Sequence, residues 1–125
     1  MPDRRMDIVM VEDDASMRQA MTRMLQAAGC IVTPYESAEA LLATGLDKAR
    51  ECDCLVFDFR LPGISGLELF RTLLASGPCP PCILITGHDA PGLRELAIRA
   101  GAHACLLKPF TGTTLLDVIL RTVAA

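Results

Sequence analysis

Short apolar runs recur along this chain, and four of them end in polar side chains of the kind that phosphate chemistry uses. The runs lead into Glu12-Asp13-Asp14, Asp58, Thr86 and Lys108. Brief stretches of Val, Ile and Leu, separated by segments with helical periodicity, are typical of buried parallel strands. Side chains just past the carboxyl ends of such strands converge on one crevice. We therefore expect these polar groups to meet in a single pocket, although they are far apart in sequence.

The segments between the apolar runs have the periodicity of amphipathic helices. The predicted helices cover residues 17–28, 38–46, 66–76, 91–100 and 113–123. Ser37 and Ser65 are the expected N-caps of the second and third helices, and glycines follow the first, third and fourth. A weaker strand over 30–33 is expected to end near Pro34, and another strand is predicted over 54–58.

Alternating strands and helices predict a (βα)₅ domain, in which helices cover both faces of a parallel five-stranded sheet. The expected strand order is 2-1-3-4-5, with the topological switch point between the first and third strands. Asp13 and Asp58 would then lie on adjacent strands where ligands bind. We expect residues 1–125 to form one domain, the usual number for a chain of this length.

Composition narrows the function classes. A net charge of −3 argues against a protein whose main task is to bind the phosphate backbone of a nucleic acid. No apolar run is long enough for a membrane span, and the first residues lead into no signal-peptide core, so a cytoplasmic protein without membrane contact is expected. The six cysteines are expected to be reduced, since several begin apolar strands, where a thiol behaves as a small hydrophobe.

The acids near the first and third strands point to a cation. Two carboxylates about 5 Å apart repel by roughly 3 kcal/mol at an effective dielectric near 20. A bound divalent cation removes this repulsion, and an all-oxygen site with few protein ligands suits Mg²⁺. The alternative is that Glu12-Asp13-Asp14 only caps the first helix. One acid would satisfy that role, and three with Asp58 beside them are more than it needs.

Asp58 stands alone at the end of its strand, where a carboxylate can be a metal ligand, a general base or a nucleophile that becomes an acyl phosphate. Phosphoryl transfer needs positioning and neutralisation of the phosphoryl oxygens. Lys108 and the Thr86 hydroxyl would supply both, together with the cation. The alternative for Thr86 is an ordinary β-branched strand residue, and for Lys108 a solvated surface lysine.

Four motifs carry a resemblance to a known family. Val11-Glu12-Asp13-Asp14, Asp58-Phe59-Arg60-Leu61-Pro62-Gly63-Ile64-Ser65-Gly66, Ile85-Thr86-Gly87-His88 and Lys108-Pro109-Phe110 resemble, in order and spacing, the receiver domain of two-component response regulators. The resemblance covers about residues 6–124, and the motif sequences are most similar to those of the FixJ-like group. It implies the flavodoxin-like form of the (βα)₅ fold.

The resemblance implies a role for each matching residue. Asp58 would accept a phosphoryl group from the phosphohistidine of a sensor histidine kinase. Asp13 and Asp58 would bind Mg²⁺ directly, Glu12 would contact the ion through water, and the backbone carbonyl of Arg60 would complete the protein's share of its ligands.

Further implications concern the phosphoryl oxygens and the output. Thr86 and Lys108 would bind these oxygens, and the Lys108-Pro109 bond would be cis. The domain would be a switch and not an enzyme. FixJ-like receivers usually precede a helix-turn-helix output domain, so transcriptional regulation is the expected context. The face formed by residues 91–100, 105–107 and 113–123 is a candidate homodimer contact.

Two positions depart from the family pattern. Glu12 replaces the usual Asp, a small change for a ligand that acts through water. Cys105 lies three residues before Lys108, where the family usually has a Tyr or Phe that acts as a rotameric switch. We therefore expect signalling to rely on Thr86 and the loop after it. Arg60 and His88 are expected to flank the pocket and to set the lifetime of the acyl phosphate.

Three other functions compete with phosphotransfer. A phosphatase of the haloacid-dehalogenase type would have a second Asp two residues after Asp58, where this chain has Arg60. A thiol redox module would use Cys79 and Cys82, but its CxxC motif should open a helix. A pseudo-receiver would bind partners without phosphorylation, although the acidic set here is complete. Cys52, Cys54, Cys79 and Cys82 are expected to gather at the amino edge of the sheet, where a zinc site is the less favoured alternative to free thiols.

Overall fold

A five-stranded parallel sheet forms the centre of the molecule in the computed structural model, which describes residues 5–87 and 92–124. The strand order is β2-β1-β3-β4-β5, as the sequence predicts. The strands are β1 (Asp7–Val11), β2 (Ile31–Tyr35), β3 (Cys54–Asp58), β4 (Cys82–Thr86) and β5 (Ala104–Leu107).

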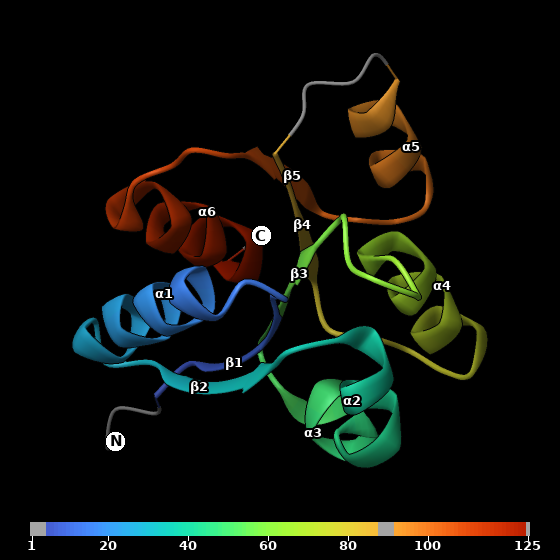
Figure 1. Ribbon diagram of the computed structural model, residues 1–125, viewed down its shortest axis with the longest axis horizontal. Helices are drawn as coiled ribbons and strands as arrows, with labels where there is room; N and C mark the ends of the chain where they lie inside the picture. The colour runs from blue at the N-terminus through green and yellow to red at the C-terminus, as the bar shows by residue number, and fades with distance from the viewer. Residues whose placement is uncertain (1–4, 88–91, 125) are drawn as a thin grey trace.

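Helices cover both faces of the sheet (Figure 1). They are α1 (Ala15–Ala27), α2 (Ala38–Thr44), α3 (Leu46–Glu51), α4 (Gly66–Ala75), α5 (Leu93–Arg99) and α6 (Gly112–Ala124). Helices α1 and α6 pack on one face, and α2 to α5 contribute to the core on the other. The predicted three-layer architecture is therefore confirmed.

The two central strands are the most deeply buried elements. All five residues of β3 and all five of β4 are buried, and successive side chains enter opposite cores. A strand covered by helices on both faces needs apolar side chains on both sides, which is why these segments are continuous apolar runs. Asp58 and Thr86, the last residues of these strands, are the polar exceptions.

Strand β2 lies at the edge of the sheet and continues past Pro34, where the sequence predicted it to end. The Ile31 amide donates to the Met6 carbonyl, and the Tyr35 carbonyl accepts from the Glu12 amide. Backbone groups of Pro34, which alternates with these residues, therefore face the open edge. A proline is tolerated there because no ladder hydrogen bond is lost, and its missing N–H protects the edge from further pairing.

The second predicted helix is divided in two. Ser37 caps α2 as predicted, accepting a hydrogen bond from the Ala40 amide at 3.0 Å, but the helix ends at Thr44 and α3 begins at Leu46. A Cβ atom on the intervening Gly45 would lie 2.3 Å from the Tyr35 hydroxyl. A larger residue there would require the Tyr35 side chain to shift. The break coincides with this tertiary contact, which helical periodicity does not report.

The remaining helix boundaries lie close to those predicted. Helix α4 begins after Ser65, whose side chain forms a reciprocal capping box with Glu68. Gly29 and Gly101 follow α1 and α5 with φ of 94° and 106°, a backbone conformation that favours glycine. The predicted start of the fourth helix, at residue 91, lies outside the described residues.

The four cysteines of the amino edge are placed as expected, but they do not form one cluster. Cys52 and Cys82 belong to the core beneath α2 to α5, with Cys79 packed against it, whereas Cys54 belongs to the core beneath α1 and α6. All six cysteines are free thiols. Within residues 5–87 and 92–124, no group of three thiols lies close enough to hold a metal.

Candidate functional site

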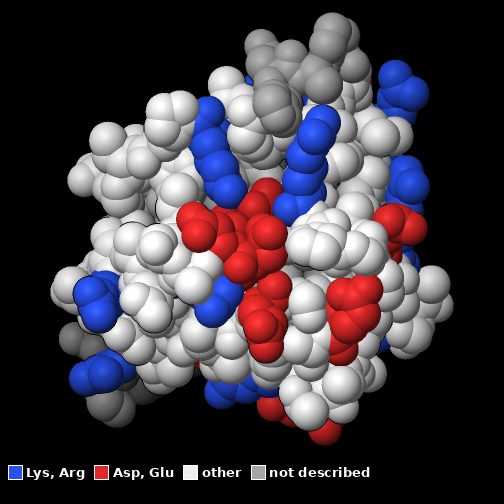
Figure 2. All heavy atoms as spheres, in the orientation of Figure 1, with Lys and Arg blue, Asp and Glu red and all other residues white. Residues whose placement is uncertain are grey.

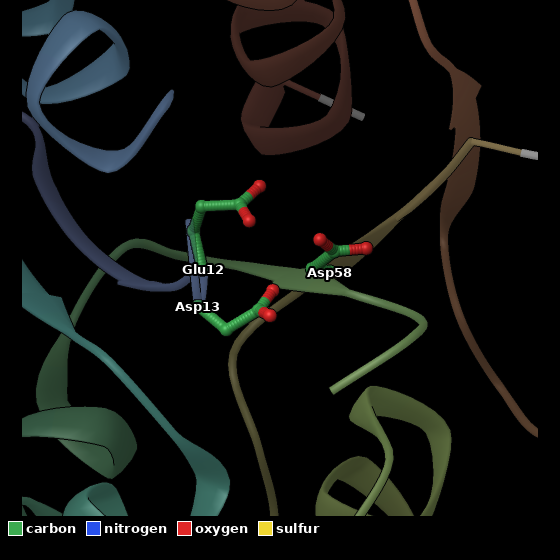
Figure 3. Close-up of side chains that lie close together, drawn as sticks. All are labelled: Glu12, Asp13 and Asp58. Carbon is green, nitrogen blue, oxygen red and sulfur yellow. The ribbon is translucent and has the colours of Figure 1, made fainter. Parts of the chain in front are cut away.

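Three carboxylates converge at the carboxyl edge of the sheet. Glu12 and Asp13 follow β1, and Asp58 is the last residue of the neighbouring strand β3. One oxygen from each lies within 4.8 Å of the others. Figure 3 shows the three side chains reaching toward one another from two strands. The predicted convergence therefore occurs, because the paired strands end side by side.

The acids differ in exposure. Glu12 is 1% exposed and Asp58 5% exposed, whereas Asp13 is open to solvent. Figure 2 shows acidic side chains gathered near the middle of this face, with basic side chains beside them. An exposed carboxylate next to two buried ones is able to bind a cation arriving from solvent.

Lys108 compensates the two buried acids. Its Nζ atom lies 3.0 Å from Glu12 Oε1 and 2.9 Å from Asp58 Oδ2. Burial raises the pKa of Glu12, although the bond from Lys108 opposes that rise. Partial burial alone would lower the pKa of Lys108, but its bonds to Asp58 and Glu12 outweigh burial and raise the pKa. The lysine is thus held charged between two carboxylates, and the interpretation of Lys108 as a solvated surface residue is wrong.

Both oxygens of Glu12 are engaged by the protein. Oε2 accepts a hydrogen bond from the Asp14 amide at 3.1 Å, in addition to the bond between Oε1 and Lys108. Asp14 itself is the N-cap residue of α1, but its side chain makes no capping bond. The acidic triplet therefore does not act simply as a helix cap. Its first member, Glu12, accepts hydrogen bonds from the Asp14 amide in the loop and from Lys108.

Thr86 and Lys108 lie at the carboxyl ends of β4 and β5, at the same edge of the sheet as the acids. Thr86 is 5% exposed at the end of β4, beside the strand that carries Asp58. Its carbonyl accepts a hydrogen bond from the Lys108 amide at 2.7 Å. The Lys108-Pro109 bond is cis, as the resemblance implied.

The loop after Asp58 turns back over the carboxylate. The Arg60 amide approaches Asp58 Oδ1 at 3.4 Å. Gly66 packs so closely that a Cβ atom there would lie 2.1 Å from the Asp58 carbonyl oxygen. The role of the Arg60 carbonyl as a metal ligand stays a prediction. His88 lies outside the described residues.

Two contacts of the site were missed by sequence reasoning. The Arg18 guanidinium, from the fourth residue of α1, donates to the Glu12 carbonyl at 3.0 Å and approaches the Asp13 carbonyl at 3.4 Å. The Glu39 carboxylate of α2 accepts from the Ile64 amide at 2.9 Å and so anchors the loop after β3. Charged side chains on a helix are usually solvated, so nothing in the sequence pattern singled out these two residues.

The arrangement could hold a hard cation. Its donors are all oxygens, as Mg²⁺ prefers, and Lys108 is bonded to two of the three acids. The thiol alternative fits poorly, because Cys82 begins a strand and burial raises its pKa well above the usual value.

Comparison with known proteins agrees with this geometry. Residues 8–120 match the family model of the response regulator receiver domain. The chain belongs to this family. Receiver domains are the signalling domains of two-component response regulators, so the chain is a signalling domain of that kind.

Named relatives are regulators of transcription. The chain is 38% identical over 115 residues to the C4-dicarboxylate transport transcriptional regulatory protein DctD of Rhizobium meliloti, covering 91% of this chain and 24% of DctD. It is 37% identical over 109 residues to the transcriptional regulatory protein FixJ of Azorhizobium caulinodans, covering 87% of this chain and 51% of FixJ. The chain therefore spans only a quarter to a half of these relatives.

A solved structure confirms the fold of the receiver. The crystal structure of FixJ-N superimposes with a TM-score of 0.86 and 34% identity, over 98% of this chain and 96% of that one.

Among the described residues of this chain, no helix is long and apolar enough to cross a membrane.

Proposed function

We propose that this receiver accepts a phosphoryl group on Asp58 from the phosphohistidine of a sensor histidine kinase. The convergence of Glu12, Asp13 and Asp58 within 4.8 Å, with Lys108 bonded to two of them, is the observation that carries the proposal. In this arrangement the three acids would hold a cation, and Lys108 would meet the oxygens of an incoming phosphoryl group.

Mg²⁺ is the proposed cofactor, and the residues present fit it. The Asp13 and Asp58 carboxylates would bind the ion directly, with the Arg60 carbonyl as a third ligand. Glu12 would act through water, which agrees with the engagement of both its oxygens by Lys108 and Asp14. When bound, Mg²⁺ would neutralise charge on the phosphoryl oxygens.

The chain's own residues would direct the transfer. An Asp58 carboxylate oxygen forms a bond to phosphorus as the bond from phosphorus to the kinase imidazole nitrogen breaks. The imidazole keeps the electron pair and later takes a proton from water. Lys108, already 2.9 Å from Asp58, would hold the arriving phosphoryl oxygens together with the Thr86 hydroxyl. Arg60, exposed beside Asp58, would influence hydrolysis of the product.

The wider role is inferred from relatives. Residues 1–125 would form one receiver that switches an output domain or partner in transcription, in the cytoplasm and without itself binding nucleic acid. Phosphorylation would act through the face made by α5, β5 and α6, where a homodimer contact is proposed. The domain would act as a switch and not as an enzyme.

Intact-protein mass spectrometry tests the proposal. Incubation with acetyl phosphate and Mg²⁺ should add one phosphoryl group, because a small acyl phosphate can replace the kinase as donor. EDTA or Asp58→Asn should abolish the addition. Stoichiometric labelling of Asp58→Asn would show that another residue is the acceptor.

A further inference from the structure

Arg18 joins the acidic loop to the helix that follows it. Its Nη1 atom donates to the Glu12 carbonyl at 3.0 Å and lies 3.4 Å from the Asp13 carbonyl, a longer and weaker contact. Its backbone amide donates to the Asp14 carbonyl at 2.8 Å. One residue thus contacts the backbone of all three acids.

The other anchors of this loop hold its ends. The Glu12 amide donates to the Tyr35 carbonyl at 3.1 Å, and the Asp14 amide donates to the Glu12 side chain. The contact from Arg18 reaches the two peptide groups that flank Asp13. Since those peptide planes set the direction of the Asp13 side chain, their orientation decides whether its carboxylate faces Asp58.

We propose that Arg18 is a positioning residue, which orients the Glu12 and Asp13 peptide groups so that the Asp13 carboxylate faces Asp58 before a cation binds. The identity of the cation rests on the proposed function. The preorganisation itself would not depend on the cation, because the contact joins Arg18 to backbone groups of the protein. Residues that orient metal ligands in this way typically change metal affinity by about 10- to 100-fold.

Charge and positioning act in opposite directions here. A guanidinium near the site repels a cation, so loss of its charge alone would tighten Mg²⁺ binding, by something on the order of twofold at physiological salt. Loss of positioning would weaken the binding. The sign of the change in affinity therefore separates the two roles.

The test compares Arg18→Ala with Arg23→Ala, which removes the same charge from an exposed site on the same helix. Calorimetric titration with Mg²⁺, without any phosphodonor, should show roughly tenfold weaker binding for Arg18→Ala. Arg23→Ala should bind as the unsubstituted protein or slightly tighter. Arg18→Lys, which keeps the charge but lacks the planar guanidinium, should lie between them. Thermal unfolding should confirm that all variants are folded.

A second readout uses the metal-free protein. Backbone order parameters of the Asp13 and Asp14 amides should fall from about 0.85 toward 0.6 in Arg18→Ala and stay unchanged in Arg23→Ala. Equal affinities and equal order parameters in the two variants would overturn the positioning role. If the unsubstituted protein bound no Mg²⁺, the proposed metal site would fail, and lower order in Arg18→Ala would still support positioning of the loop.

Discussion

Both edges of the sheet carry ionisable side chains, but in very different arrangements. At the carboxyl edge, Glu12, Asp13 and Asp58 come from two strands and meet within 4.8 Å. At the amino edge, Cys54 and Cys82 begin neighbouring strands, yet their side chains enter opposite cores. Glu12 and Asp13 lie beyond the last residue of β1, where the chain is free to turn, whereas the pleat dictates the direction of both cysteines. Asp58, at the end of β3, is therefore met by side chains from the turn after β1, whereas the pleat separates the two cysteines.

The comparison predicts that the thiols at the amino edge are unreactive. The rate of their alkylation should show the largest expected effect. Burial raises the pKa of Cys52 and of Cys54 to about 12. At pH 8 their thiolate fractions, and hence their alkylation by iodoacetamide, should be on the order of 1000-fold lower than in unfolded chain. Peptide mass spectrometry of native and guanidinium-unfolded protein would measure the ratio. Equal rates in the two states would mean that the amino edge is open and reactive.

The same thiols should make the fold sensitive to alkali. The native state keeps protons that the unfolded chain releases above about pH 8.5. Their contribution to the free energy of unfolding is therefore fully present below that pH, and it is lost as the pH rises toward 12. Denaturant titrations across this range would detect the decline, and a flat profile would contradict it.

Close packing at the carboxyl edge predicts a large loss of stability for Gly66→Ala. The new Cβ atom would lie 2.1 Å from the Asp58 carbonyl oxygen, a backbone atom that cannot move without displacing the site. We expect the free energy of unfolding to fall by about 3 kcal/mol. Gly87→Ala is the matched control, since its Cβ would only contact Lys108 Cδ at 3.9 Å. Similar denaturant midpoints for the two variants would show that the loop yields easily.

Replacing a lysine should lower the free energy of unfolding more at the carboxyl edge than at the amino edge. Lys108→Met leaves the buried Glu12 and Asp58 without their cation, and should lower the metal-free free energy of unfolding by about 2 kcal/mol. Mg²⁺ should restore part of that loss, and phosphorylation by acetyl phosphate should slow on the order of 100-fold. Lys48→Met removes a single pair with Asp7 at 3.4 Å, and its lysine side chain is 45% exposed. That change should cost below about 1 kcal/mol. Equal losses would erase the distinction between the edges.

The smallest effect is expected at Cys105, which is only partly buried in β5. The Thr86 hydroxyl gains a charge-assisted bond only in the phosphorylated state, so Thr86→Ala should weaken phosphorylation-dependent association by roughly fivefold. Cys105→Ala should change it by less than about twofold, because the thiol is too small to act as an aromatic switch. Analytical ultracentrifugation of each variant with and without phosphodonor would measure both. A large loss in Cys105→Ala, with phosphorylation intact, would assign the switch to the thiol.

The sequence by itself determined the order of elements and the membership of the acidic site. Apolar runs and helical periodicity are local patterns, and the parallel (βα)₅ topology follows from their alternation. Because parallel strands end at one edge, Glu12, Asp13, Asp58 and Lys108 were expected to meet. The hydrogen-bond partners of these residues do not follow from the sequence alone.

Only the tertiary structure decided the contacts between distant surfaces. Tyr35 packs against Gly45 where the second predicted helix is divided, and Arg18 reaches back to the carbonyls of Glu12 and Asp13. The assignment of Cys54 and Cys82 to opposite cores also depended on the register of the strands. Each of these depends on side-chain direction and on the close approach of elements far apart in sequence. Periodicity carries no such information, because it records which face of an element is buried and not what that face touches.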